Sequence, residues 1–212
     1  MAQFFTVHPE NPQPRLIRAA VEIIREGGVI AYPTDSCYAL GCHIGDKAAM
    51  ERIRKIRDVD ERHHFTLVCR SLSEVGQFAK VDNLQYRLIR ATTPGHYTFI
   101  LRATRDVPRR LLTPRHTIGV RIPDHPVPLA LLAALDEPLL SSTLILPEHG
   151  VALNDAEEIR RQLEHSLDLV IDSGPCHGEV TTVVDLSGDQ PQLIREGSGD
   201  IRPFGFVKAA LH

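Results

Sequence analysis

The chain has 212 residues, of which 42% are hydrophobic and 24% are charged, and its formal net charge is −3. These values are those of an ordinary soluble protein with one large domain or at most two small ones, and they exclude a globally basic protein. No apolar run approaches the roughly 20 residues that span a bilayer, and residues 1–12 lack the features of a signal peptide. We therefore expect a cytoplasmic protein with no membrane partner.

The four cysteines, Cys37, Cys42, Cys69 and Cys176, form no Cys-x-x-Cys pair. In a cytosolic chain of this size they are expected to be free thiols. Cys37 and Cys42 lie close to His43 in the sequence, but this spacing matches no familiar zinc pattern. We predict no structural metal.

Apolar periodicity and turn residues predict helices that alternate with short strands. Residues 15–26 place their apolar side chains on one helical face, and a strand over 29–32 follows the stop at Gly27-Gly28. Asp46 is positioned to cap a second helix, and Asp82 a later one. The further expected elements are strand 65–69, helices near 72–80 and 83–91, strand 97–103, a short helix near 107–112, strand 117–122, helix 127–135, strand 139–146, helix 155–165, and strands 168–172, 181–186 and 192–195.

This order of elements predicts a single mixed α/β domain built around one twisted sheet with flanking helices. No repeat, low-complexity tract or flexible linker divides the chain. The residues after Arg202 are expected to be a loosely attached end. We place the domain at 1–205 and a C-terminal tail at 206–212.

Polar side chains recur where the predicted strands end. Ligands of open α/β sheets bind at strand ends, and hydroxyls combined with cations suit a phosphate or a carboxylate. No Walker sequence, Rossmann glycine fingerprint or nucleophile elbow is present, so we expect a nucleotide site of another kind. The residues concerned are Thr34, Asp35, Ser36, Lys55, Arg57, Thr98, Arg121, Ser141, Ser142, Thr143, Thr181, Thr182 and Arg195.

Each of these groups alone also has a structural explanation. Residues 34–36 suit a turn with Asx hydrogen bonds. Lys55 and Arg57 complement the dipole at a helix end, and paired threonines are common in strands. The pair His63-His64 is typical of a surface. The shared location at strand ends favours the functional interpretation.

Basic residues are concentrated in one stretch. Between Arg102 and Arg121 there are six arginines and one acid, Asp106. A local excess of cations without balancing acids favours an anionic partner.

Seven segments, in their order along the chain, resemble the YrdC/YciO family and are closest to its YciO branch. The resemblance implies a twisted open α/β fold with a positively charged concave face. It also implies affinity for nucleotide and for tRNA or double-stranded RNA. The segments are YPTDSCYALG (32–41), KIR (55–57), PGHYTFIL (94–101), IGVRIPDHP (118–126), DLVIDSG (168–174), TTVVDL (181–186) and REG (195–197).

Catalytic members of this family make threonylcarbamoyl-AMP from L-threonine, bicarbonate and ATP with Mg²⁺. The resemblance therefore implies ATP and Mg²⁺ as cofactors, L-threonine and ATP or AMP as ligands, and the following residue roles. The catalytic candidates are Lys55 and Arg57. The phosphate-binding candidates are Thr143, Thr181, Thr182 and Arg195. The candidates for an amino-acid pocket are Thr34, Asp35, Ser36, Tyr38 and Arg121. The RNA-binding candidates are Arg102, Arg105, Arg109, Arg110 and Arg115.

The sequence departs from the catalytic relatives at a Ser-x-Asn motif, where it has Thr143 and Ile145, and isoleucine has no hydrogen-bonding group. Three hypotheses stay open. The protein synthesises threonylcarbamoyl-AMP, or it removes a threonylcarbamoyl group from a nucleotide or tRNA, or it binds RNA without catalysis.

Overall fold

The computed structural model describes residues 1–60, 63–148 and 150–207. No helix in this part of the chain is long and apolar enough to cross a membrane. The helices are α1 (Pro14–Arg25), α2 (Lys47–Arg57), α3 (Leu72–Phe78), α4 (Asn83–Thr92), α5 (Pro126–Leu135) and α6 (Ala156–Leu163), with 3₁₀ turns η1 (Arg109–Leu111) and η2 (Arg202–Phe204). The strands are β1 (Gln3–Thr6), β2 (Ile30–Tyr32), β3 (Ala39–His43), β4 (Thr66–Val68), β5 (Ala79–Lys80), β6 (Tyr97–Ala103), β7 (Thr117–Arg121), β8 (Leu139–Thr143), β9 (Leu169–Asp172), β10 (Thr182–Asp185) and β11 (Gln192–Arg195).

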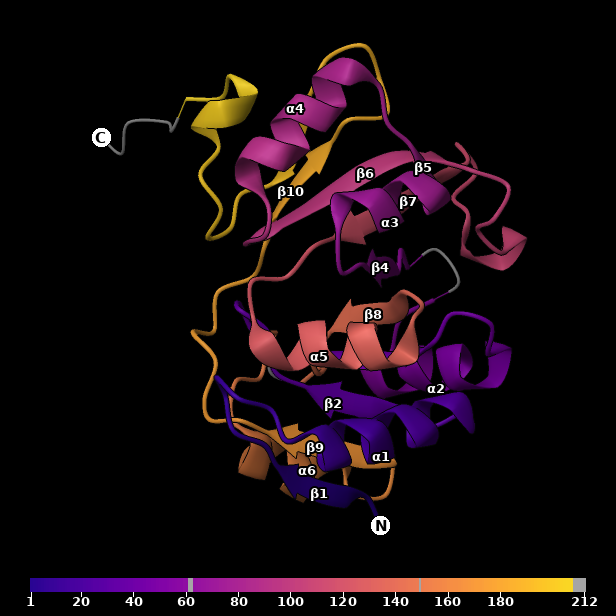
Figure 1. The fold of residues 1–212 in the computed structure, drawn as a ribbon, viewed down its shortest axis with the longest axis vertical. Coiled ribbons are helices and arrows are strands. Elements are labelled where there is room, and N and C mark those ends of the chain that lie inside the picture. Colours follow the sequence, from indigo (N-terminus) through magenta and orange to yellow (C-terminus); the bar gives the residue numbers. More distant parts are fainter. Residues whose placement is uncertain (61–62, 149, 208–212) are drawn as a thin grey trace.

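One mixed sheet runs along the long axis of the molecule, from β1 near one end to β10 near the other (Figure 1). Its strand order is β1-β9-β2-β3-β8-β4-β7-β6-β10-β11, and β5 pairs with β6. The pairs β1/β9, β9/β2, β4/β7 and β6/β10 are parallel, and the others are antiparallel. The predicted single α/β domain with an open mixed sheet and flanking helices is confirmed.

The helices cover the two faces of the sheet unequally. Helices α1 and α5 lie side by side (Figure 1) and share one apolar cluster with Ile30, Tyr32, Leu139, Leu169 and Ile171. Helices α2, α3, α4 and α6 share a larger cluster with the alternate residues of the same and further strands. Because successive strand residues point to opposite faces, the two clusters mark two faces. On β4, Val68 still belongs to the cluster with α1 and α5. Over β7, β6 and β10, none of the described helices contributes to a cluster on that face.

Side-chain caps fix the helix starts that the sequence predicted. Asp46 Oδ1 accepts from the Ala49 N–H at 2.8 Å. Asp82 Oδ1 accepts from the N–H groups of Leu84 and Gln85, both at 2.8 Å, and Gln85 completes a capping box. Each bond pairs a backbone donor that the first helical turn leaves free.

Three strands were not expected, and their local sequences explain why. β1 pairs only with β9 and has half-buried phenylalanines. β3 is buried along nearly its whole length, so it has no alternation of apolar and polar residues. The helix expected over 72–80 ends at Phe78, because Ala79 and Lys80 pair with β6 instead.

The expectation of a loosely attached end after Arg202 is wrong for Phe204. This side chain is buried, and its ring centroid lies 5.8 Å from that of Tyr97 and 5.9 Å from that of Phe99. Phe206 also packs against the larger cluster. The predicted tail lies outside the described residues from position 208 onward.

Candidate functional site

The loop that joins β2 to β3 is locked by its own polar side chains. Thr34 Oγ1 donates to the Cys37 carbonyl at 2.7 Å and accepts from the Ser36 N–H at 3.1 Å. The Ser36 carbonyl accepts from the Gly178 N–H at 3.0 Å. These bonds hold residues 34–36 buried at the end of the strand, and the turn is closed by the Thr34 hydroxyl rather than by an Asx side chain.

Arg121, at the end of β7, is buried against this loop. Its Nη2 donates to Asp35 Oδ1 at 2.5 Å, to Ser36 Oγ at 3.1 Å and to Thr34 Oγ1 at 3.4 Å. Both members of the Arg121–Asp35 ion pair are less than a tenth exposed. Asp35 Oδ2 and Arg121 Nε are buried and have no hydrogen-bond partner in the part of the chain that the structure describes.

The uncovered face of the sheet forms the floor of a cavity of about 660 Å³. Alternation along the strands decides which side chains reach it. On β4, Leu67 enters the core, whereas Thr66 and Val68 line the cavity. We call it the main cavity and define it by Arg57, His63, Thr66, Thr98, Arg121, Ser142, Thr143, Ile145, Thr181, Asp185 and Arg195.

Arg195 enters the main cavity from β11 and is fixed by the end of β10. Its Nε donates to the Thr181 carbonyl at 3.0 Å and its Nη2 donates to Thr181 Oγ1 at 3.1 Å. Thr181 Oγ1 also lies 2.9 Å from Thr98 Oγ1. Burial lowers the pKa of Arg195, and the positive charge of Arg121 lowers it further. The cations therefore share one electrostatic environment.

Arg57, the last residue of α2, reaches the cavity from another side. Its Nη1 lies 2.6 Å from Ser142 Oγ and 3.1 Å from His63 Nε2, and its Nε donates to the Ile145 carbonyl at 3.4 Å. Burial lowers the pKa of Arg57, and the charge of Arg195 lowers it further. Arg57 and Arg195 form no ion pair with an acid among the described residues.

Of the residues predicted for catalysis, phosphate binding and the amino-acid pocket, five line one cavity: Arg57, Arg121, Thr143, Thr181 and Arg195. Arg115, predicted to bind RNA, also lines it. Residues 34–36 lie directly behind Arg121.

Three predicted residues lie elsewhere. Thr182 is fully buried, and its hydroxyl donates to the Gly199 carbonyl at 2.7 Å, so it holds the loop before η2. Tyr38 points into the larger cluster, and its hydroxyl donates to the Gly174 carbonyl at 3.0 Å. Lys55 is exposed and is not among the residues that line the main cavity.

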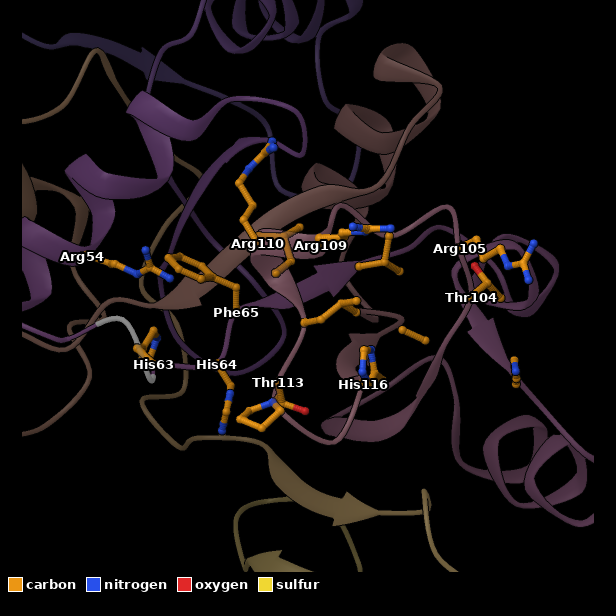
Figure 2. A pocket seen from close by; sticks show the side chains of 16 residues that line it. Arg54, His63, His64, Phe65, Thr104, Arg105, Arg109, Arg110, Thr113 and His116 are labelled. Atoms are coloured by element: carbon orange, nitrogen blue, oxygen red, sulfur yellow. The ribbon is translucent and has the colours of Figure 1, made fainter.

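A second hollow of about 1410 Å³ adjoins the main cavity, because His63, His64, Phe65, Thr113 and Pro114 line both. Figure 2 shows its side chains, with Arg54 beside Phe65 and Arg109 next to Arg110. No aspartate or glutamate is among its described lining residues. We call it the basic hollow and define it by its cations Arg54, Lys80, Arg105, Arg109 and Arg110 and by the histidines His63, His64 and His116.

The five predicted RNA-binding arginines separate into two groups. Arg105, Arg109 and Arg110 line the basic hollow. Arg102 and Arg115 line a smaller hollow of about 420 Å³. There Arg115 forms an ion pair with Asp185, and Arg102 Nε donates to the Ser187 carbonyl at 2.9 Å. The arginine-rich stretch therefore does not form one uniform face.

The residues that sequence reasoning undervalued are His63 and Ser142. The pair His63-His64 is typical of a surface, but in the structure His63 Nε2 lies 2.9 Å from Ser142 Oγ in the main cavity. The sequence feature that could have indicated this location is the position of His63 shortly before the buried strand β4. Ser142 was noted among the strand-end hydroxyls but received no role.

The comparisons with known proteins identify the family. The family model that matches residues 22–197 is described as Sua5_yciO_yrdC, telomere recombination. The chain belongs to the Sua5/YciO/YrdC family. It is 55% identical to the Escherichia coli protein YciO over 96% of this chain and 100% of that protein. The crystal structure of E. coli YciO superimposes with a TM-score of 0.93, with the same coverage of both chains.

More distant members of the Sua5/YciO/YrdC family carry functional names. A threonylcarbamoyl-AMP synthase of Nitrosococcus oceani is 33% identical over 73% of this chain and 84% of that protein. The crystal structure of P. abyssi Sua5 complexed with L-threonine has a TM-score of 0.85 at 26% identity, covering 92% of this chain and 57% of that one. The predicted resemblance to this family is confirmed.

The donor sets of the described residues do not form a metal site. No group of three or more histidine, cysteine, aspartate or glutamate side chains is suitably placed there. Asp185, the carboxylate among the described residues that line the main cavity, is already paired with Arg115. Magnesium is bound through carboxylates and substrate phosphates. The protein side of a Mg²⁺ site therefore does not fit, and we derive no step through this ion.

The four cysteines are free thiols, as predicted. Burial raises the pKa of Cys37, and it raises the pKa values of Cys42 and Cys176 to about 12. Thiols in such surroundings stay protonated near neutral pH and are poor nucleophiles. The chemistry of the main cavity is therefore assigned to its arginines, hydroxyls and histidine.

Proposed function

We propose that the main cavity binds an adenosine nucleotide together with a threonylcarbamoyl group. The observation that carries this proposal is the convergence of Arg57, Arg121 and Arg195 with the hydroxyls of Thr143 and Thr181 around one cavity. Guanidinium groups bind phosphate and carboxylate oxygens in bidentate geometry, and hydroxyls add neutral donors. The named synthase and the Sua5 complex with L-threonine support this choice of ligand.

In this proposal the two ends of the ligand bind to different cations. Arg57 and Arg195 hold the phosphate, because neither forms an ion pair with an acid in the part of the chain that the structure describes. Arg121 and Asp35 hold the threonyl end, since each has one buried polar atom without a hydrogen-bond partner in the described chain. Beyond hydrogen-bonding distance, His96 Nε2 lies 3.9 Å from Asp35 Oδ2. Buried polar groups are nearly always hydrogen-bonded, so these two atoms favour a ligand with both a donor and an acceptor.

We propose removal of the threonylcarbamoyl group as the reaction. A triphosphate carries more charge than two free arginines balance, and Lys55 lies outside the main cavity. Ile145, which replaces the family asparagine, lines the cavity with an apolar side chain. A single phosphate in an RNA backbone or in AMP matches this cation count better than ATP does.

The removal reaction is balanced without ATP. The bond between the carbamoyl carbon and N6 of adenosine breaks. Water supplies a hydroxyl to that carbon and a proton to N6. The N-carboxythreonine that leaves loses CO₂ and gives threonine. The protein's contribution is to orient the group and to stabilise negative charge on the carbonyl oxygen with fixed donors.

The test incubates the protein with tRNA that carries threonylcarbamoyladenosine and then digests the tRNA to nucleosides. We expect loss of the modified nucleoside together with an equal amount of released threonine. Arg57→Ala should reduce the rate at least about tenfold, the value of one hydrogen bond to a charged group. Arg18→Ala, an exposed position on α1, is the matched control. Unchanged modification with active controls of tRNA integrity would refute removal.

Synthesis of threonylcarbamoyl-AMP is the second candidate. Its specific support is the 33% identity to the N. oceani synthase. Under this alternative, the protein releases pyrophosphate from ATP only when threonine and bicarbonate are present. Release equal to that of Arg57→Ala would exclude it.

We propose that the basic hollow docks the tRNA, or another double-stranded RNA, whose modified base enters the main cavity. Its support is the absence of acids among its described lining residues and its shared border with the main cavity. Phosphate contacts from Arg105, Arg109 and Arg110 position the RNA without reading its sequence. The proposal includes a cytoplasmic location, where tRNA is found. If RNA binds and neither reaction is detected, the non-catalytic hypothesis stands.

A further inference from the structure

Three groups in the main cavity meet at one hydroxyl. Ser142 Oγ, on β8, lies 2.6 Å from Arg57 Nη1 and 2.9 Å from His63 Nε2. The serine is only 5% exposed, and all three residues line the main cavity. The groups come from α2, from the segment before β4, and from β8, so the fold brings together residues up to 85 positions apart.

The proton positions in this group follow from simple chemistry. A guanidinium only donates, so Arg57 Nη1 donates to Ser142 Oγ. The serine proton must then point to another acceptor, and His63 Nε2 is within reach. Burial and the neighbouring Arg57 lower the pKa of His63 to about 4, so the ring is neutral near pH 7. Arg57 Nη1 also lies 3.1 Å from His63 Nε2 and can only donate, so Nε2 is the unprotonated ring nitrogen and is an acceptor shared by Arg57 and the serine hydroxyl. The hydroxyl is thus bonded to a base on one side and to a fixed cation on the other.

The neighbouring serine shows what a structural hydroxyl looks like in the same strand. Ser141 Oγ lies 2.7 Å from the Tyr32 hydroxyl and donates to the Leu40 carbonyl at 3.0 Å. Both partners belong to the core or to the backbone. The partners of Ser142 are instead two ionisable side chains that face the cavity. A serine whose proton points to a neutral histidine is the arrangement that activates a nucleophile.

We propose that Ser142 is a nucleophile, that His63 is its general base, and that Arg57 stabilises the oxygen as it loses its proton. This inference rests on the proposed function for its substrate, a threonylcarbamoyl group on adenosine, and deepens it by naming the attacking atom.

The first step is balanced as an acyl transfer. Ser142 Oγ forms a bond with the carbamoyl carbon while His63 Nε2 takes the serine proton. The carbon–N6 bond then breaks, and His63 returns that proton to N6. The threonylcarbamoyl group remains on Ser142 as a carbamate ester.

In the second step water attacks the same carbon, and His63 again accepts a proton. The ester bond breaks, Ser142 Oγ recovers its proton from His63, and N-carboxythreonine leaves. The sum of the two steps consumes one water and no other reagent.

The closing experiment uses a fluorophosphonate probe, which reacts with activated serines: the oxygen–phosphorus bond forms and fluoride leaves. We expect a single adduct on the peptide that contains Ser142, located by mass spectrometry. Ser142→Ala should lose it, and His63→Gln should slow it at least about tenfold, within the range for general-base catalysis. The matched controls are Ser166→Ala and His165→Gln, a serine and a histidine on an exposed turn.

Each outcome decides something different. Absence of an adduct on Ser142, or equal labelling of His63→Gln, overturns the inference. If Ser142→Ala does not fold, His63→Gln still gives the answer because it leaves the nucleophile in place. Cleavage of modified tRNA that persists in Ser142→Ala removes Ser142 from the mechanism but keeps the proposed function. Adduct formation without tRNA cleavage keeps the activated serine and removes the proposed substrate.

Discussion

Arg121 shows how a single residue links the fold to the candidate site. Its neighbours on β7, Ile118 and Val120, enter the core, whereas Arg121 lies on the opposite face of the strand and is held by Asp35. A charge at this depth is tolerated because its counter-charge is buried with it. In the sequence TIGVRI, Arg121 stands between apolar residues, a pattern that fits a cation facing either solvent or a partner and that does not identify Asp35.

The first prediction concerns this ion pair. Arg121→Met leaves the carboxylate of Asp35 buried without its cation, and we expect a loss of about 3–5 kcal/mol in the free energy of unfolding. Urea denaturation at pH 7 measures it. Adding Asp35→Leu should recover most of the loss. A cost below about 1 kcal/mol, the value of an exposed pair, would contradict the buried pairing.

The second prediction concerns His63 and pH. Burial lowers the pKa of His63 from 6.5, the value of a histidine in the unfolded chain, to about 4 in the folded protein. Between these values the unfolded chain binds more protons than the folded one, so this residue makes the free energy of unfolding rise with pH. Its contribution is complete above pH 6.5 and is lost as the pH falls towards 4.

Urea denaturation at several pH values between 4.5 and 7.5 gives the test of this second prediction. His63→Gln should have a smaller dependence of the unfolding free energy on pH than the unsubstituted protein, and His165→Gln should not. Equal slopes for His63→Gln and the unsubstituted protein would show that the histidine is not buried beside Arg57.

At the scale of elements, η2 (Arg202–Phe204) packs on β6. Phe204 packs on the rings of Tyr97 and Phe99, and the loop before η2 is tied to Thr182. The two neighbouring threonines therefore have different roles. Thr182 is buried and holds the loop before η2, whereas Thr181 faces the main cavity and accepts a hydrogen bond from Arg195.

The third prediction tests the packing of η2 on β6. Phe204→Ala should cost about 3–5 kcal/mol in the free energy of unfolding because it removes a buried aromatic ring. Val207→Ala, at a position that is 88% exposed, should change it by less than about 0.5 kcal/mol. Calorimetry or denaturant titration checks both. If both variants changed the free energy of unfolding by a similarly small amount, Phe204 would not stabilise the fold and this packing would be contradicted.

Elements with a strong local signal were predictable, and the unexpected ones depend on distant partners. Helix α4 could be predicted because Asp82 and Gln85 form its cap from within the same turn. β5 could not, because Ala79 and Lys80 become a strand only by pairing with β6. The same distinction applies to the site. The strand-end hydroxyls and arginines were visible in the sequence, but the burial of Thr182 and the contact between His63 and Ser142 arise from packing.

At the scale of the whole molecule, unequal helix coverage of one sheet creates the site. Helices on one face bury a continuous core, and α1 and α5 cover only part of the other face. The uncovered part is lined by threonines, serines and arginines, and the basic hollow continues from it. The main cavity and the basic hollow thus share one border.

The fourth prediction concerns that larger surface. Binding of duplex RNA should weaken with salt by a slope of roughly −0.7 to −0.9 in log K against log[salt] per phosphate contact. Arg105→Glu with Arg109→Glu should reduce both the affinity and the slope. Arg15→Glu with Arg18→Glu, an equal change of charge at exposed positions of α1, should affect binding much less. Equal losses for the two pairs would show an effect of net charge rather than of the basic hollow.

The proposed function requires that the cations of the main cavity bind one phosphate. Titration calorimetry with AMP and with adenosine tests this claim without assuming a direction of reaction. We predict that AMP binds at least about tenfold more tightly than adenosine, and that Arg195→Ala removes this difference because it loses a charged hydrogen bond to phosphate. Equal affinities of AMP and adenosine for the unsubstituted protein would contradict the account.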